Sequence, residues 1–191
     1  IDPTFFPFDG QWETWTRNEA VWDSKRVWFV SFDNGRVSFE QRFYPSGFAR
    51  LVHKATGSPS YGRTGPTKDR FIPSGDGTEV ADTLTGLVWR RCAAGMAWNN
   101  AAQTCDGAAT EFQWREALEF ARANHQDGWR IPNVKELISL ADYQKRSSPA
   151  IDETAFPNTP NSHLSSTPLD DSGNLFVKVV SFTRGSVEQA D

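Results

Sequence analysis

The most regular alternation of hydrophobic and polar residues lies near the two ends of the chain. Residues 25–41 (KRVWFVSFDNGRVSFEQ) hold two runs of β-branched and aromatic residues around an Asp-Asn-Gly turn centred on Asn34. Asn and Gly accept a positive φ, so the pattern predicts a β-hairpin. Residues 175–189 (LFVKVVSFTRGSVEQ) repeat it around Gly185 and predict a second hairpin. Residues 47–55 (GFARLVHKA) predict a further strand after the first hairpin.

The two regions are related by a shift of 150 residues without a gap. The shift superposes Ile1, Asp2, Thr4, Phe6 and Pro7 on Ile151, Asp152, Thr154, Phe156 and Pro157. It also superposes Val27, Val30, Ser31, Phe32, Gly35 and Val37 on Val177, Val180, Ser181, Phe182, Gly185 and Val187. Two clusters of identities in one register predict an internal repeat.

The repeat predicts how the chain is divided. Residues 1–54 are interpreted as the C-terminal, β-rich half of a first domain, and residues 55–68, rich in Gly, Pro, Ser and Thr, as a linker. Residues 69–191 are interpreted as a second domain that lacks its last strand. Because a missing strand leaves an unpaired sheet edge, we expect another segment to cover it. Polypeptide before residue 1 and after residue 191 is the favoured source; packing of the first segment on the second domain, possibly in another chain, is the alternative.

The second domain opens with a different pattern. Residues 69–92 (DRFIPSGDGTEVADTLTGLVWRRC) predict turns at Gly77 and Gly86 and an apolar strand at 87–89. Oxygen-bearing side chains recur at Ser74, Asp76, Thr78 and Asp82, as in a calcium loop. The downstream bidentate Glu of an EF-hand is missing, which favours a structural turn.

Two helices are predicted next. Residues 112–125 (FQWREALEFARANH) place Trp114, Ala117, Leu118 and Ala121 on one face, opposite Arg115, Glu119 and Arg122. Residues 131–144 (IPNVKELISLADYQ) begin with Asn133 followed three residues later by Glu136, which predicts a capping box. Between the two helices, the sequence DGWRIP predicts a turn and a short extended piece with Trp129 in the core.

Composition and charge narrow the possible roles. The chain has 38% hydrophobic residues and eight Trp, as expected of a folded globular protein. Its formal net charge of −4 argues against a nucleic-acid partner, which would need a basic patch. The sequence has no apolar stretch of about 18 residues, so no transmembrane segment is predicted.

Cys92 and Cys105 bracket a short loop. A zinc site is disfavoured because none of the three histidines lies near a cysteine, and a disulfide outside the reducing cytosol is preferred over two half-buried thiols. No metal and no cofactor are predicted.

At this point the motifs resemble a known family. The stretches DRFIPSGDGTEVADTLTGLVW, FQWREALEFA, GWRIPNVKELISLADY, PAIDETAFPNTP and SSTP follow one another as in the Lcl C-terminal domain family, which takes its name from a bacterial collagen-like surface protein. The resemblance covers 69–191, and residues 1–54 resemble the family's second half, so tandem copies are predicted. The family's usual aromatic before SST is Leu164 here, whereas Trp15 keeps it in the first copy.

The resemblance implies an α+β fold related to C-type lectins, with two helices packed on a small twisted mixed sheet with long loops. It implies an extracytoplasmic bacterial module, located in the periplasm, on an outer-membrane lipoprotein or at the cell surface, that binds glycan or protein ligands in adhesion. Calcium-binding signatures of lectins are missing, and no catalytic residues are implied. The only local candidates for acyl transfer, Ser165 or Ser166 beside His163, are better explained as a turn, so we expect no enzymatic activity.

Two non-enzymatic roles are therefore expected. The first is a surface adhesin or lectin-like receptor, in which aromatic rings stack on sugars beside an arginine. The candidate ligand-binding residues are Trp12, Trp15, Arg17, Trp22, Trp28 and Arg130. For the tryptophans, the alternative is a place in the hydrophobic core; for Arg130, it is pairing with a local carboxylate. The second role is a periplasmic or lipoprotein inhibitor, such as the immunity partner of a secreted toxin.

Overall fold

The computed structural model describes residues 13–32, 34–41, 48–49, 70–125, 128–171 and 174–190. The first strands are β1 (Glu13–Ala20), β2 (Asp23–Ser31), β3 (Val37–Gln41) and β4 (Phe48–Ala49). They are followed by β5 (Phe71–Pro73), β6 (Glu79–Asp82), β7 (Leu87–Arg90), β8 (Ala97–Asn99), β9 (Thr104–Asp106), α1 (Trp114–Ala123) and α2 (Val134–Ile138). The last strands are β10 (Ser162–Asp171), β11 (Asn174–Ser181) and β12 (Ser186–Ala190). The fold is of the predicted α+β class, and the predicted linker at 55–68 lies outside the described residues.

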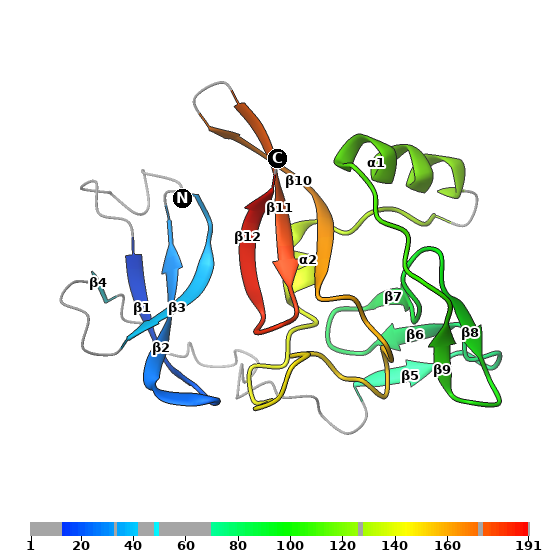
Figure 1. The fold of residues 1–191 in the computed structure, drawn as a ribbon, viewed down its shortest axis with the longest axis horizontal. Coiled ribbons are helices and arrows are strands. Elements are labelled where there is room, and N and C mark those ends of the chain that lie inside the picture. The colour runs from blue at the N-terminus through cyan, green and yellow to red at the C-terminus, as the bar shows by residue number, and fades with distance from the viewer. Residues whose placement is uncertain are drawn as a thin grey trace.

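Seven strands form one sheet in the order β10-β11-β12-β3-β2-β1-β4 (Figure 1). Neighbouring strands are antiparallel except β1 and β4, which are parallel. The early and late parts of the chain meet where β3 pairs with β12, with Val37 opposite Val187. One mixed sheet therefore joins the first segment of the chain to its last one.

The strands β1–β3 and β10–β12 pair in corresponding registers when β1 is shifted by 149 residues and β2 and β3 by 150, so the repeat contains a one-residue gap that the ungapped sequence comparison does not predict. The corresponding pairs are Val30–Val37 with Val180–Val187, and Trp15–Phe29 with Leu164–Val179. The register is also interrupted at the same place, after Trp15 in β1 and after Leu164 in β10. Because side chains alternate between the faces of a sheet, equal registers give corresponding residues the same facing.

Both predicted hairpin turns are confirmed. Gly35 has a φ of 70° and Gly185 a φ of 80°, the left-handed region that favours glycine. The Gly35 N–H donates to the Ser31 carbonyl at 2.9 Å, and the Gly185 N–H donates to the Ser181 carbonyl at 2.8 Å. At Gly185 a Cβ would also lie 3.1 Å from the Tyr143 ring, so this turn is packed against the loop after α2.

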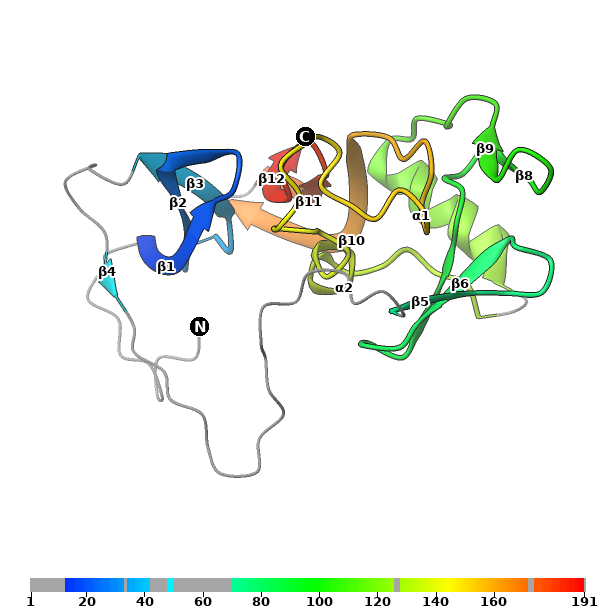
Figure 2. The same cartoon turned by 90° about the horizontal axis from the view of Figure 1, so that it is seen from below.

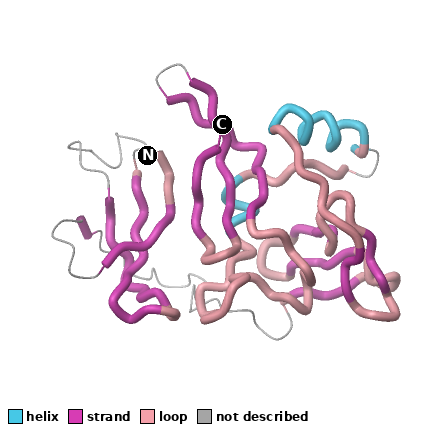
Figure 3. The backbone as a smooth tube through the Cα atoms, viewed as in Figure 1, coloured by secondary structure: helices cyan, strands magenta, loops and turns pink. Residues whose placement is uncertain are grey.

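The middle of the chain forms two small sheets. Strands β5-β6-β7 form a three-stranded antiparallel sheet, with the predicted turns at Gly77 and Gly86, and β8 pairs with β9. Figure 2 shows these sheets at the opposite end of the molecule from β1–β3, with β10–β12 between them. Figure 3 shows both helices beside the β10–β12 half of the large sheet. Among the described residues, the helices and the small sheets thus lie beside the β10–β12 half of the large sheet and not beside β1–β3.

The helix α1 occupies the predicted position, with Ala117 buried and Arg115, Glu119 and Arg122 exposed. The predicted capping box of α2 is confirmed, because the Asn133 side chain accepts from the N–H of Glu136 and the Glu136 carboxylate accepts from the N–H of Asn133. The helix itself is shorter than predicted and ends at Ile138.

The helix α2 ends early because the residues that follow it make tertiary contacts. Leu140 and Ala141, which would continue the helix, are buried in the core, and the Asp142 N–H donates to the Ala150 carbonyl at 2.9 Å. The main core contains Val80, Leu137, Leu140, Ile151, Phe156, Val180, Phe182 and Val187, from β6, α2, the following loop, β11, β12 and the turn between these two strands. Packing against this core outweighs the local helical pattern.

Candidate functional site

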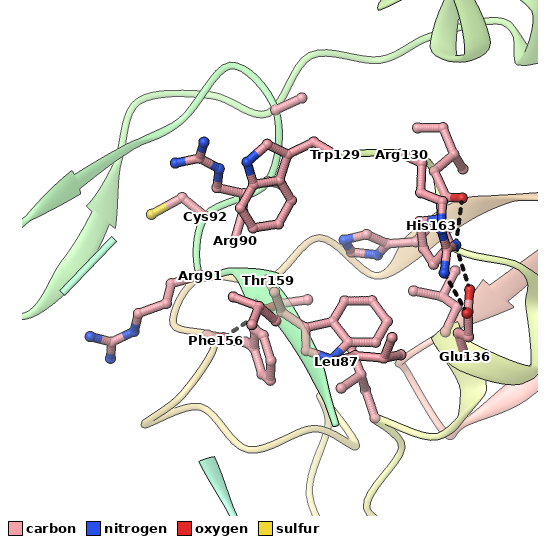
Figure 4. Close-up of a pocket in the computed structure, with 18 of the residues that line it drawn as sticks. Leu87, Arg90, Arg91, Cys92, Trp129, Arg130, Glu136, Phe156, Thr159 and His163 are labelled. Atoms are coloured by element: carbon pink, nitrogen blue, oxygen red, sulfur yellow. Dashed lines mark hydrogen bonds and ion pairs between the residues drawn. The ribbon is translucent and has the colours of Figure 1, made fainter. Parts of the chain in front are cut away.

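A pocket of about 480 Å³ lies beside β10 and is the candidate functional site. One wall is formed by β7 and the residues after it, 86–94; a second is the extended segment 128–132; a third contains His163 on β10. The floor is made by core residues, among them Leu137 and Phe156. Figure 4 shows Trp129 and His163 on opposite sides of the pocket, with Leu87 and Phe156 on another. This volume lies in the usual range for small-ligand and side-chain pockets.

Apolar groups dominate the walls of the pocket. Trp89 and Trp129, both half-buried, contribute indole rings from β7 and from the segment 128–132. The Arg90 guanidinium lies 4.4 Å from the centre of the Trp129 ring and also pairs with Glu79 at 3.2 Å. The charge of Arg90 is therefore compensated, and its cation covers one face of Trp129.

Two polar atoms of the pocket residues have no hydrogen-bond partner. Trp89 Nε1 and His163 Nδ1 are both inaccessible and unpaired within the described part of the chain. A buried polar group left without a partner costs about 1–3 kcal/mol. The Trp89 indole N–H, a donor, and the His163 Nδ1, whose role depends on its tautomer, therefore have unused hydrogen-bonding capacity in residues that line the pocket.

His163 is held in its neutral form. Burial lowers the pKa of His163 to about 4, and its ring packs edge-on against Phe182 with the centroids 5.3 Å apart. Neutral imidazole can donate one hydrogen bond and accept another. The Ser165 hydroxyl donates to the Lys178 carbonyl at 2.7 Å instead of to this imidazole, so the hydroxyl is already engaged within the sheet.

Arg130 lies at the rim of the pocket and makes a two-pronged ion pair with Glu136, with nitrogen–oxygen distances of 2.8 and 2.6 Å (Figure 4). The bond to Glu136 raises the pKa of Arg130, and the bond to Arg130 lowers the pKa of Glu136. The sequence left two interpretations of Arg130, ligand binding and pairing with a local carboxylate. In the structure Arg130 pairs with a local carboxylate, that of Glu136. Its charge supports the start of α2 through Glu136.

Arg91 and Cys92 stabilise the wall of the pocket that is formed by residues 86–94. Cys92 and Cys105 form the predicted disulfide. The Arg91 guanidinium donates to the carbonyls of Gly77, Thr154 and Ala155 at 2.6–3.2 Å. Arg91 lines the pocket but its guanidinium points away from it in Figure 4, so its role is to join β7 to the loop after residue 150.

The tryptophans predicted to bind ligand lie elsewhere. Trp15 packs on Phe29 at 6.1 Å, and Trp22 is half-buried beneath the Arg184 guanidinium at 4.9 Å. Trp28 is 3% exposed and packs on Tyr143 at 4.8 Å, so its ring is part of the core. Trp12 and the side chain of Arg17 lie outside the described residues.

Residues of the pocket that sequence reasoning missed are Trp89, Trp129 and His163. The sequence pattern predicts a core position for Trp129, and it presents His163 only as a possible base for a neighbouring serine. A usable signal was present: LVWRR and GWRIP each place a tryptophan beside an arginine at the end of an extended piece. Nothing in the sequence showed that these distant pieces face each other.

Ser74, Asp76 and Thr78, which the sequence offers as possible calcium ligands, form a hydrogen-bonded turn. The Asp76 carboxylate accepts hydrogen bonds from the Ser74 hydroxyl at 2.6 Å and from the Thr78 N–H at 3.1 Å. These bonds, that of Ser74 first, lower the pKa of Asp76 to about 2. Among the residues that the structure describes, no three His, Cys, Asp or Glu side chains gather as a metal site would require.

Comparison with known proteins gives one match. Residues 78–191 match the model of the Lcl C-terminal domain. No curated protein and no solved structure matches the chain. In the described residues, no helix is long and apolar enough to cross a membrane.

Proposed function

The chain belongs to the Lcl C-terminal domain family, and on that premise we propose that it is a non-enzymatic recognition module of the bacterial cell envelope. The ligand, a glycan or a protein segment, binds in the pocket between β7, the segment 128–132 and β10. The module acts outside the cytoplasm, in the periplasm, on a lipoprotein or at the cell surface. The disulfide between Cys92 and Cys105 supports this location, because such bonds persist in oxidising compartments.

One observation carries the proposal: the pocket is apolar but contains the unpaired Trp89 Nε1 and His163 Nδ1. Among the described residues, the Nε1 atoms of Trp28 and Trp98 are unpaired as well, but these residues do not line the pocket; what distinguishes Trp89 and His163 is that they lie beside an open volume that packing has not filled. A ligand that brings an apolar group together with a hydrogen-bonding group would complete both. Binding is favoured over chemistry because the hydroxyl of Ser165 is already engaged and, in the part of the chain that the structure describes, no group pairs with His163 Nδ1 to orient the imidazole.

The finer architecture proposed here is a C-type-lectin-like fold carried as a tandem repeat. Two helices beside a mixed sheet with long loops support the first part. The equal registers of β1–β3 and β10–β12 support the second, because unrelated hairpins have no reason to interrupt their pairing at corresponding residues. The first segment would then supply the sheet of one copy, and residues 69–191 most of the other.

A second candidate role is inhibition of a secreted toxin or enzyme by docking on it. It is favoured by a row of side chains on the outer face of the three-stranded sheet, where Ile72 lies opposite Ala81 and Ala81 opposite Val88. Ile72 and Val88 are 54% and 51% exposed. Exposed apolar rows of this kind are typical of protein-contact surfaces.

The two candidates are separated by two variants measured against arrays of defined oligosaccharides and peptides. Trp129→Ala removes a pocket wall. Ile72→Ser changes the end of the exposed row that does not line the pocket, whereas Val88 of the same row does line it. The proposed function predicts saturable binding to an array member that falls at least tenfold with Trp129→Ala and is unchanged with Ile72→Ser. Binding that falls at least tenfold with Ile72→Ser and is unchanged with Trp129→Ala would place the ligand on the exposed row and support the inhibitor role.

A further inference from the structure

The pocket lies between two sheet edges. Strand β10 is the last strand on one side of the seven-stranded sheet, and β7 is the last strand of the three-stranded sheet. Both strands line the pocket. Within the described ranges no strand pairs with the outer side of either one. Further along β10, the Ser166 N–H donates to the Pro132 carbonyl at 2.9 Å and the Ser165 carbonyl accepts from Trp114 Nε1 at 3.0 Å, so the part of this edge left open is that of His163 and Leu164. Unpaired strand edges next to an apolar pocket are the arrangement in which proteins add a peptide as an extra strand.

The chain itself contains a template for such an addition. On the outer side of β1, strand β4 pairs in parallel, with Phe48 opposite Thr14 and Ala49 opposite Trp15. By the common register, Trp15 corresponds to Leu164, and Thr14 therefore corresponds to His163. The edge that β4 covers in one half of the sheet is thus the edge beside the pocket in the other half.

The geometry of a sheet then determines what an added strand would place in the pocket. Residues paired across neighbouring strands have their side chains on the same face. The face of His163 is the pocket face, since His163 lies opposite the buried Val180 and its ring contacts Phe182. A residue paired with His163 would therefore direct its side chain into the pocket.

We propose that the ligand is an extended peptide segment that adds to β10 as a parallel strand at His163 and Leu164 and inserts one aromatic or large aliphatic side chain into the pocket. This inference rests on the proposed function and names its ligand class. The residue opposite the corresponding position of β1 is Phe48, which suggests an aromatic residue at the inserted position.

A peptide fits the site better than an oligosaccharide. The hydroxyls of a sugar need many polar partners, whereas most residues of the lining are apolar, Trp, Leu, Ile and Phe among them. The two arginines at the rim are already paired, Arg90 with Glu79 and Arg130 with Glu136, so neither is free for a sulfate or a carboxylate. The backbone of β10 supplies the polar bonds that an extended peptide requires.

The test uses the full chain and the synthetic peptide GFARLVHK, the sequence of residues 47–54. We expect saturable binding by fluorescence anisotropy, at least tenfold weaker when the phenylalanine of the peptide is replaced by aspartate. Binding should also fall at least tenfold with Trp129→Ala. Trp129 is half-buried and lies in an extended segment. Ile72→Ser, outside the pocket, should bind as the unaltered chain does. A second pocket variant, His163→Gln, covers the case in which Trp129→Ala does not fold.

Amide hydrogen exchange by NMR then separates strand addition from other ways of filling the pocket. With saturating peptide, an amide of His163 or Leu164 should exchange at least tenfold more slowly. One outcome would be that the chain does not bind the peptide but binds an oligosaccharide, and that Trp129→Ala abolishes the oligosaccharide binding. This outcome would overturn the peptide inference and leave the proposed function standing. If no array member and no peptide binds in a way that depends on Trp129 or His163, both are overturned.

Discussion

The two halves of the large sheet share their strand registers but differ at their outer edges. In one half, β4 pairs with the outer edge of β1, and Thr14 is the residue of β1 that lies opposite Phe48. In the other half the edge of β10 adjoins a pocket, and the corresponding residue is His163, a half-buried residue whose Nδ1 is inaccessible. In the described part of the chain, the helices and the small sheets lie beside this second half. The same strand arrangement thus serves as a closed structural unit in one place and as a candidate binding edge in the other.

The largest expected effect concerns the closed half. Trp28 packs on Trp22, Phe39 and Tyr143, and thereby links β2 to the loop after α2. Trp28→Ala should lower the free energy of unfolding by about 3–5 kcal/mol, because a large buried ring is replaced by a cavity. Urea denaturation measures this change. Trp22→Ala, at a half-exposed ring, should cost less; equal losses would show that Trp28 is not the central residue of this contact.

Only the pocket half is crosslinked. The disulfide joins residues separated by 13 positions, and a loop of that size is expected to contribute about 3 kcal/mol. The double variant Cys92→Ser, Cys105→Ser should lose that amount in urea denaturation, and reductant should lower the stability of the unaltered chain but not of the variant. A loss below about 1 kcal/mol would mean that Arg91 and its carbonyl partners brace the wall without the disulfide.

His163 makes the pocket half sensitive to pH, whereas Thr14 cannot titrate. The pKa of His163 is lowered to about 4 in the folded state, and an unfolded histidine has a pKa of about 6.5. The unfolded state therefore binds more protons as the pH falls, and stability is lost between pH 6.5 and pH 4. Between pH 7 and pH 5 the loss due to His163 should be about 2 kcal/mol.

The measurement is the difference in unfolding free energy between the unaltered chain and His163→Gln at pH 7 and pH 5. Subtracting the two chains removes the contribution of carboxylates that titrate in the same range. A pH dependence that is identical in both chains would contradict the buried, neutral state of His163.

The smallest effect is expected at the pocket rim. Arg130 is exposed and pairs with Glu136 in a two-pronged geometry. Exposed ion pairs contribute about 0–1 kcal/mol, so Arg130→Ala should lower the unfolding free energy by less than about 1 kcal/mol and leave peptide binding within twofold. A tenfold loss of peptide binding would give Arg130 a direct contact with the ligand.

Sequence patterns predicted the local features well. The turns at Gly35 and Gly185, the capping box of Asn133 and Glu136, and the disulfide each depend on residues close in sequence, so short-range chemistry determines them. The length of α2 was not predictable in this way, because burial of Leu140 and Ala141 in a core built from distant strands ends the helix.

The pocket was predictable only in its parts. Trp89, Trp129 and His163 come from three separate stretches, and each on its own reads as an ordinary core residue. The tryptophans that form a dense group in the sequence instead pack on one another or on β2 and β3, as Trp22 and Trp28 do. What decides the difference is which faces the sheet topology leaves uncovered, and topology is set by long-range pairing.

Native-state amide exchange without ligand distinguishes a covered edge at β1 from an open edge at β10. Of two consecutive amides in a strand, one points to each neighbouring strand. At Thr14 and Trp15 both amides should exchange slowly. At His163 and Leu164 one should be slow and the other at least a hundredfold faster, until the peptide GFARLVHK is added. Equal, slow exchange of both amides at His163 and Leu164 in the free chain would contradict the account.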